Sequence, residues 1–233
     1  MSGILYGVGV GPGDPELMTL KAIRAIETAD VIIAPKTEKK EDSVALTIAQ
    51  PYLKQGVEVL KLVFPMVFNQ NELSDAWLSN RDTIVELLAA GKKVVFLTLG
   101  DPMFYSTFIY VHNLLRDEGH LIEVIPGITA FCAIGSKLGY PLAEGNDVLS
   151  IIPATAPEEK ITRALASADN VVLMKVYKNL DEVVSSLEQH DLLENARMIS
   201  RCGMPDEVIT RDLTGAMNSR QNYLSTIVSH KRA

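Results

Sequence analysis

Short apolar runs alternate with amphipathic stretches along the first half of the chain. The apolar runs predict β-strands at residues 4–10, 30–34, 57–62, 93–98 and 121–125. Stretches with helical periodicity lie between them, at residues 15–29, 43–53, 71–90 and 105–118. A strand–helix alternation of this kind predicts a parallel sheet with helices on both of its faces.

The second half of the chain has a different rhythm. A helix is predicted near residues 128–138, and further strands are predicted near 148–152, 170–176, 196–201, 207–212 and 222–229. No long helix separates the last two strands, which predicts some antiparallel pairing. We therefore expect an α/β protein with two α/β domains, 1–120 with a parallel sheet and 121–233 with a mixed sheet. The cleft between two such domains is a usual ligand site.

Composition narrows the class of protein. The chain has 233 residues, 47% of them hydrophobic, and a net charge of −7, which argues against a nucleic-acid partner. No apolar run reaches the roughly 18 residues of a membrane-spanning helix. The strand pattern begins at Ile4 and leaves no room for a signal peptide, so the cytoplasm is the expected location.

Cysteine and histidine offer little chemistry. Cys132 and Cys202 lie far apart, and a disulfide is not expected in a reducing compartment. The four histidines lack metal-ligand spacing, and no Cys–His pair or Ser–His–Asp set can be argued from the sequence. The expectation is a site without a bound metal and without an activated protein nucleophile.

A glycine-rich turn, residues 9–15 (GVGPGDP), follows the first predicted strand. Its glycines let a ligand approach the backbone, and Asp14 and Pro15 suit the start of a helix. A dinucleotide fingerprint G-x-G-x-x-G fails here, because Pro12 or Asp14 stands where its third glycine is needed. No P-loop sequence occurs either, so a tight turn without a ligand and a different ligand both remain open.

Four further segments share this character of glycine, proline and polar residues, or end a predicted strand. They are residues 97–103 (LTLGDPM), 126–130 (PGITA), 172–175 (VLMK) and 201–207 (RCGMPDE). In open α/β sheets, ligands bind outside the carboxyl ends of strands, where the first of these segments are predicted to lie.

In this order and at these separations, the segments resemble the tetrapyrrole (corrin/porphyrin) methylase family over nearly the whole chain. Residues 96–108 (FLTLGDPMFYSTF), 64–66 (FPM) and 223–226 (YLST) resemble its C20-methylating branch. That branch acts on precorrin-2 or on cobalt-factor II in cobalamin biosynthesis. The resemblance implies the family fold, a homodimer, and S-adenosylmethionine as methyl donor, which is released as S-adenosylhomocysteine.

The resemblance also implies the donor contacts. They are expected in the interdomain cleft, at Pro12, Gly100, Asp101, Met103, Phe104, Ser106, Thr129, Ala130, Met174 and Gly203. Methyl transfer from a sulfonium needs close positioning of two substrates rather than a protein nucleophile, which agrees with the absence of a nucleophilic constellation.

Asp101 and Tyr105 are the candidate catalytic residues. Asp101 has three interpretations: it contacts the donor, it accepts a proton from the acceptor ring, or it caps the helix after an Asp-Pro turn. Tyr105 and Ser106 either present hydroxyls to the cleft or pack in the first turn of the next helix. Met103 would be an ordinary core residue without its motif, and so would Met174.

The roles of two loops and the residues that bind the acceptor remain undecided from the sequence. Residues 37–42 form a solvated charged loop or a lid, and residues 63–68 form core packing, a wall for a planar substrate, or a dimer contact. The basic residues that could bind the carboxylates of the acceptor are Lys36, Lys39, Lys40 and Arg81.

Two alternative functions stay open. One is another methylase of the family, such as one like diphthine synthase, and the other is a non-catalytic sensor of S-adenosylmethionine.

Overall fold

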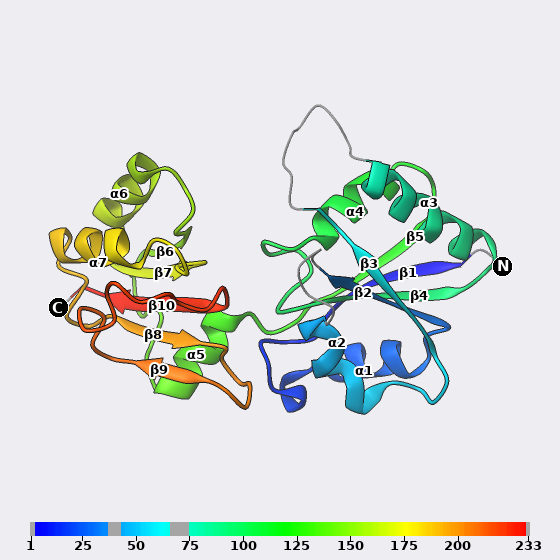
Figure 1. Ribbon diagram of the computed structural model, residues 1–233, viewed down its shortest axis with the longest axis horizontal. Helices are drawn as coiled ribbons and strands as arrows, with labels where there is room; N and C mark the ends of the chain where they lie inside the picture. The colour runs from blue at the N-terminus through cyan, green and yellow to red at the C-terminus, as the bar shows by residue number, and fades with distance from the viewer. Residues whose placement is uncertain (1–2, 37–42, 66–74, 232–233) are drawn as a thin grey trace. The chain divides into compact units, whose positions relative to one another are not determined.

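A computed structural model describes residues 3–36, 43–65 and 75–231 of the chain. The chain divides into two compact units after Thr129, and each unit is built around its own five-stranded sheet (Figure 1). The sequence placed the domain boundary earlier, between residues 120 and 121. The division falls later because the strand Leu121–Ile125 pairs with the first strand of the chain.

The first unit holds a wholly parallel sheet in the order β3-β2-β4-β1-β5. Helices α1 and α2 cover one face, and α3 and α4 cover the other (Figure 1). The strands are β1 (Ile4–Gly9), β2 (Val31–Lys36), β3 (Glu58–Val63), β4 (Lys93–Thr98) and β5 (Leu121–Ile125). The helices are α1 (Leu20–Glu27), α2 (Val44–Ala49), α3 (Asp75–Ala89) and α4 (Phe108–Leu115).

The predicted helix at 15–29 is interrupted. Asp14 accepts the Glu16 N–H at 2.9 Å and caps a single 3₁₀ turn, Pro15–Leu17. Thr19 then accepts the Ala22 N–H at 3.2 Å and caps α1 separately. A second capping residue so close to the first restarts the helix, and sequence periodicity does not reveal such a break.

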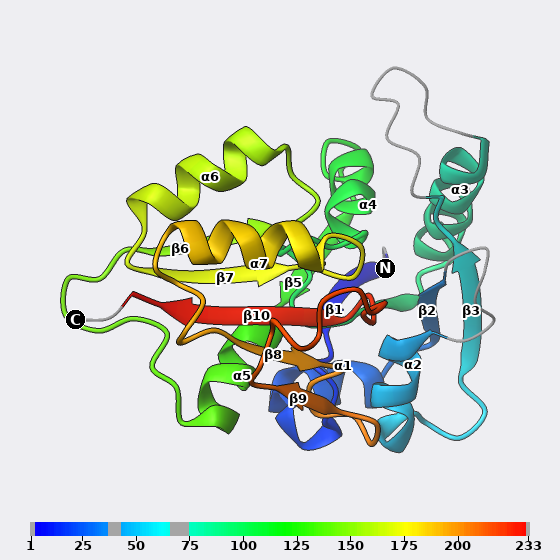
Figure 2. The same cartoon turned by 60° about the vertical axis from the view of Figure 1, so that its left-hand side comes forward.

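The second unit holds a mixed sheet in the order β6-β7-β10-β8-β9, in which only β6 and β7 pair in parallel. In Figure 2, α6 and α7 lie on one face of this sheet and α5 lies on the other. The helices are α5 (Ala130–Leu138), α6 (Glu158–Ser167) and α7 (Leu180–Gln189). The strands are β6 (Leu149–Pro153), β7 (Asn170–Met174), β8 (Arg197–Ser200), β9 (Val208–Thr210) and β10 (Ser225–His230).

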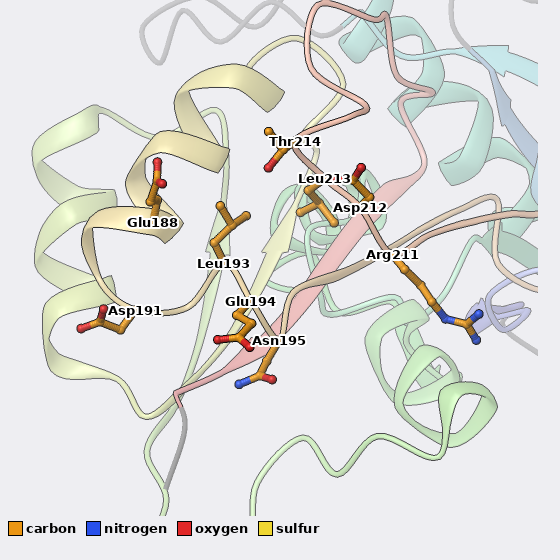
Figure 3. A pocket seen from close by; sticks show the side chains of 9 residues that line it. All are labelled: Glu188, Asp191, Leu193, Glu194, Asn195, Arg211, Asp212, Leu213 and Thr214. Carbon is orange, nitrogen blue, oxygen red and sulfur yellow. The ribbon is translucent and has the colours of Figure 1, made fainter.

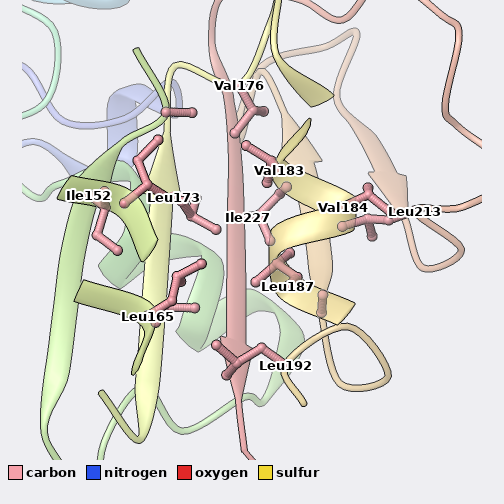
Figure 4. Close-up of a cluster of buried hydrophobic side chains, with 14 of the residues drawn as sticks. Ile152, Leu165, Leu173, Val176, Val183, Val184, Leu187, Leu192, Leu213 and Ile227 are labelled. Carbon is pink, nitrogen blue, oxygen red and sulfur yellow. The ribbon is translucent and has the colours of Figure 1, made fainter. Parts of the chain in front are cut away.

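Each unit has its own buried apolar cluster. In the first unit, Phe96 of β4 packs against Phe108 of α4 and Phe64, with ring centroids 5.4 and 5.6 Å apart. In the second unit, Leu173 and Ile227 of the sheet pack beneath α6 and α7 (Figure 4). Two independent cores allow each unit to hold its own loops in place. No helix among the described residues combines the length and apolar character needed to cross a bilayer.

Candidate active site

Three loops of the first unit leave the same edge of its sheet. β1 lies between β4 and β5, and the registers Gly9↔Thr98 and Val8↔Ile125 bring the three carboxyl ends level. Beyond the strands, the Gly100 N–H donates to the Gly11 carbonyl at 2.8 Å. The predicted segments 9–15, 97–103 and 126–130 therefore meet, as expected for loops at the carboxyl ends of parallel strands.

Glycine is required where these loops touch. A Cβ atom at Gly9 would lie 2.5 Å from the Gly127 nitrogen, and one at Gly127 would lie 2.1 Å from the Gly100 carbonyl oxygen. Gly100 itself has φ +71°, a conformation that residues with a side chain rarely adopt. Gly9, Gly100 and Gly127, which we call the glycine junction, hold the three loops backbone to backbone.

Asp101 ties two of these loops together through its side chain. Its Oδ1 accepts the Met103 N–H at 2.8 Å, and its Oδ2 accepts the Gly127 N–H at 3.0 Å. These bonds agree with the Asp-Pro turn of the third interpretation, but the two N–H groups lie outside α4, so the carboxylate organises the turn and does not cap that helix. A carboxylate held by two backbone donors has fixed geometry, whatever further contact it makes.

The segment after Asp101 presents aromatic and thioether groups to the outside. Met103 is 47% exposed and Tyr105 is 45% exposed, and the rings of Phe104 and Tyr105 lie 4.6 Å apart. Tyr105 has φ +47°, which is uncommon for a residue with a side chain and is typical of functional loops.

Ser106 behaves differently from its neighbours. It is buried, and its Oγ accepts the Phe108 N–H at 2.9 Å at the start of α4. This is the helix-start packing that the sequence left open for Ser106. Its place in a donor site stays a prediction, as does that of Pro12, which is buried in the first loop.

Two threonine hydroxyls at this edge are buried without a hydrogen-bond partner among the described residues. They are Oγ1 of Thr129, in the third loop, and Oγ1 of Thr98, the last residue of β4. Buried polar groups of proteins are nearly always paired, so each hydroxyl points to a missing partner such as a ligand or water. Sequence analysis named Thr129 and not Thr98. Ala130, the next predicted contact, opens α5.

The second unit brings Met174 and the segment 201–207 to one edge of its sheet. Met174 ends β7 and pairs with Thr226 of β10, whose neighbour Ser225 pairs with Ser200 at the end of β8. The turn that carries Gly203 follows Ser200 directly and leads into β9. The predicted contacts of this unit therefore share an edge. That they bind one donor together with the loops of the first unit stays a prediction.

Glu207 holds the Gly203 backbone, and sequence analysis did not find it. Its Oε2 accepts the Gly203 N–H at 2.7 Å, and its Oε1 lies 2.9 Å from Nζ of Lys137 on α5. Burial alone would raise the pKa of Glu207, but the Lys137 ammonium and the Gly203 N–H more than offset it and lower that pKa. The sequence signal was present only as an acidic residue ending the RCGMPDE segment.

A hollow of about 720 Å³ lies elsewhere in the second unit (Figure 3). Its lining residues include Leu193, Glu194 and Asn195, which precede β8, and Arg211, which follows β9. The antiparallel register Met198↔Thr210 places these residues at the sheet edge opposite to Gly203. The hollow is therefore separate from the predicted donor contacts of this unit.

Several other expectations can be placed. Phe64 is buried and its ring lies 4.9 Å from that of Trp77, so this part of segment 63–68 is core packing. Arg81 already pairs with Asp82 and Glu118. Residues 37–42 and 66–68 lie outside the described residues. Among the residues that the structure describes, no cluster of three metal-ligating side chains occurs.

Comparison with known proteins agrees with this arrangement. The family model "Tetrapyrrole (Corrin/Porphyrin) Methylases" matches residues 4–217. The chain is 38% identical to cobalt-precorrin-2 C(20)-methyltransferase of Salmonella typhimurium, over all of this chain and 98% of that protein. It is 34% identical to precorrin-2 C(20)-methyltransferase of a Sinorhizobium species, over 90% of each chain.

A solved structure agrees in fold. The X-ray structure of cobalt precorrin-4 methyltransferase, CbiF, superposes with a TM-score of 0.75 at 25% identity, over 97% of this chain and 94% of that one. Two α/β units, one with a parallel and one with a mixed sheet, are therefore the fold that this chain shares with that methyltransferase. The chain belongs to the tetrapyrrole (corrin/porphyrin) methylase family.

Proposed function

We propose that this chain transfers a methyl group from S-adenosylmethionine to C20 of precorrin-2 or cobalt-factor II in cobalamin biosynthesis. The observation that carries the proposal is the 38% identity, over the full chain, to a cobalt-precorrin-2 C(20)-methyltransferase. The glycine junction supports it, because all three of its loops are intact at the edge where the donor is expected.

The chemistry asks for positioning more than for activation. The bond between the sulfonium and the methyl carbon breaks, a bond from the methyl group to C20 forms, and a thioether and one proton are released. Holding the two carbons in line and in contact supplies up to about 10 kcal/mol of the barrier. Fixed backbone loops suit this task, and a nucleophilic side chain is not needed.

The donor site is proposed to include Pro12, Gly100, Asp101, Met103, Phe104, Ser106, Thr129, Ala130, Met174 and Gly203. The unpartnered hydroxyl of Thr129 supports this assignment, because polar groups of the donor would satisfy it. For the released proton, Asp101 and Tyr105 are the proposed acceptor side chains, and the Asp101 carboxylate is already held in place by two backbone N–H groups.

A homodimer and a cytoplasmic location belong to the proposal as well. The homodimer is what the family resemblance implies. Sedimentation of the purified chain tests the dimer, and a mass of one chain would contradict it.

A turnover assay under anaerobic conditions tests the activity. S-adenosylmethionine is offered with precorrin-2 and with cobalt-factor II separately, mass spectrometry detects one added methyl group, and NMR places it. Methylation of one acceptor at C20 supports the proposal and identifies the route. Donor binding without methylation of either acceptor would contradict it and favour another methylase of the family or a sensor.

A further inference from the structure

Two tyrosines stand side by side at the sheet edge that carries Met174. Tyr177 lies in the turn after β7 and Tyr223 in the turn before β10, and their ring centroids are 5.1 Å apart at an interplanar angle of 65°. The antiparallel register Thr226↔Met174 brings these two turns together. Tyr223 remains 42% exposed, and neither ring belongs to the buried apolar cluster of the unit.

Both turns are held in place by polar contacts. In the first turn, Asn179 donates from its side chain to the Ala154 carbonyl at 2.9 Å, and the neighbouring Val176 is fully buried. In the second turn, the Leu224 N–H donates to Oδ1 of Asn222 at 2.9 Å. The aromatic pair is therefore fixed before a ligand arrives, which lowers the entropy lost on binding.

Positive charge accompanies the aromatic pair. Nζ of Lys178 lies 5.3 Å from the centroid of the Tyr177 ring, within the range of a cation–π contact. Lys175, two residues before Tyr177, belongs to the same turn, but burial lowers its pKa and disfavours its charged form, so the exposed Lys178 supplies the positive charge. In a chain of net charge −7, this ammonium attracts anions locally.

Backbone strain marks the same edge. Among the residues that the structure describes, five other than glycine have a positive φ, and two of these, Lys175 and Arg201, directly follow β7 and β8. The Arg201 N–H donates to the carbonyl of Leu224, the neighbour of Tyr223, at 3.0 Å. Strained residues other than glycine gather at binding and catalytic sites more than elsewhere.

We propose that Tyr177, Tyr223 and Lys178 recognise the methyl acceptor: the conjugated face of the tetrapyrrole stacks on the exposed Tyr223 ring, which Tyr177 supports edge to face, and one of its carboxylates pairs with the Lys178 ammonium. This inference rests on the proposed function for the identity of the ligand. Aromatic stacking suits an extended π-system, and an ammonium held over a ring keeps N–H groups for a carboxylate. We call these three side chains the acceptor corner.

Binding of precorrin-2 and of cobalt-factor II, measured anaerobically by fluorescence without turnover, tests the acceptor corner. We expect Tyr223→Leu to weaken acceptor binding roughly tenfold, because stacking on an aromatic ring is lost. Tyr223→Phe keeps the ring and should stay within about twofold of the parent chain. Lys178→Met should weaken binding about threefold and reduce its salt dependence. Binding of S-adenosylmethionine should not change in any variant.

Lys160→Met on α6 removes the same charge from an exposed position and is the matched control; it should bind the acceptor like the parent chain. If the parent chain binds and methylates the tetrapyrrole and the Tyr223 and Lys178 variants bind it equally well, the acceptor corner is wrong and the proposed function stands. If these variants lose binding but no methyl group reaches C20, the corner stands and the proposed function fails. If the parent chain binds neither tetrapyrrole, both are overturned.

Discussion

Oδ2 of Asp101 accepts the backbone N–H of Gly127 at 3.0 Å, and this bond joins the loop after β4 to the loop after β5. In the sheet, β1 lies between β4 and β5, so the Asp101 side chain connects loops whose strands are not neighbours. The other carboxylate oxygen holds the Met103 N–H within its own loop. Asp101 therefore positions both loops at the glycine junction.

Asp101→Asn tests this positioning role. An amide has only one accepting oxygen, so one of the two backbone N–H groups loses its acceptor, at a cost of about 1–3 kcal/mol. We expect S-adenosylmethionine to bind roughly tenfold more weakly, and the protein to unfold at a lower temperature. Calorimetry of donor binding and of unfolding measures both. A collapse of kcat with unchanged donor binding and stability would instead make Asp101 the proton acceptor.

Gly127→Ala tests the glycine junction. The added methyl group would lie 2.1 Å from the Gly100 carbonyl oxygen, so at least one loop must move. We expect a loss of about 2–4 kcal/mol in the free energy of unfolding, measured by urea titration. Gly56→Ala is the control, because its Cβ meets nothing within 4 Å and only its φ of +76° opposes the change. That control should lose only about 1 kcal/mol, and equal losses in the two variants would contradict the junction.

Periodicity alone was enough to predict both sheets, because strands buried between helices leave uninterrupted apolar runs. Residues 93–98 and 121–125 became β4 and β5 at the expected bounds. Helices α6 and α7 were not named individually from the sequence. The order of the strands in the second sheet could not be predicted either, because β10 inserts between β7 and β8. Long-range contacts decide that position.

The site was predictable as a set of loops and not as a set of contacts. The glycines at positions 9, 100 and 127 indicated turns, but the sequence does not show that the backbones of these turns are in contact. Glu207 and Thr98 were missed for a related reason: one acts through the Gly203 backbone and the other is a buried strand residue. Their significance depends on what lies across the fold from them.

Glu207→Ala tests how Gly203 is held. The variant leaves the Gly203 N–H and the Lys137 ammonium without their shared partner, and we expect donor binding to weaken roughly fivefold. Glu207→Gln keeps an acceptor for the N–H and should bind the donor more nearly like the parent chain. Equal donor affinity in all three proteins, measured by calorimetry, would show that Gly203 needs no such support.

The same carboxylate makes a prediction about pH. The folded-state pKa of Glu207 lies below its ordinary value, so its stabilising contribution is present above that ordinary value and lost as the pH falls through the folded pKa. We expect Glu207→Gln to be less stable than the parent chain by about 1 kcal/mol at pH ~7, and the difference to shrink in acid and vanish once the pH falls below the folded-state pKa of Glu207. Glu159→Gln, which removes an exposed ion pair with Arg163, should show no such difference. A difference in stability that persists in acid would show that it comes from packing and not from the charge of Glu207.

The two thiols should differ in reactivity, and the difference reports on the Gly203 turn. Cys132 is exposed, whereas burial raises the pKa of Cys202 to about 11 and the nearby Glu207 carboxylate acts in the same direction. At pH ~8 we expect iodoacetamide to label Cys132 in the native protein and both thiols in urea, because the thiolate is the reactive form. A Cys132→Ser variant isolates Cys202, and adding Glu207→Gln to it should speed native labelling by lowering that pKa. Rapid labelling of native Cys132→Ser protein at pH ~8 would mean that the turn opens in solution, and that Glu207 does not hold it closed.

The raised pKa of Cys202 also predicts how stability depends on pH. Because Cys202 keeps its proton in the folded state, the free energy of unfolding should fall as the pH rises above ~9.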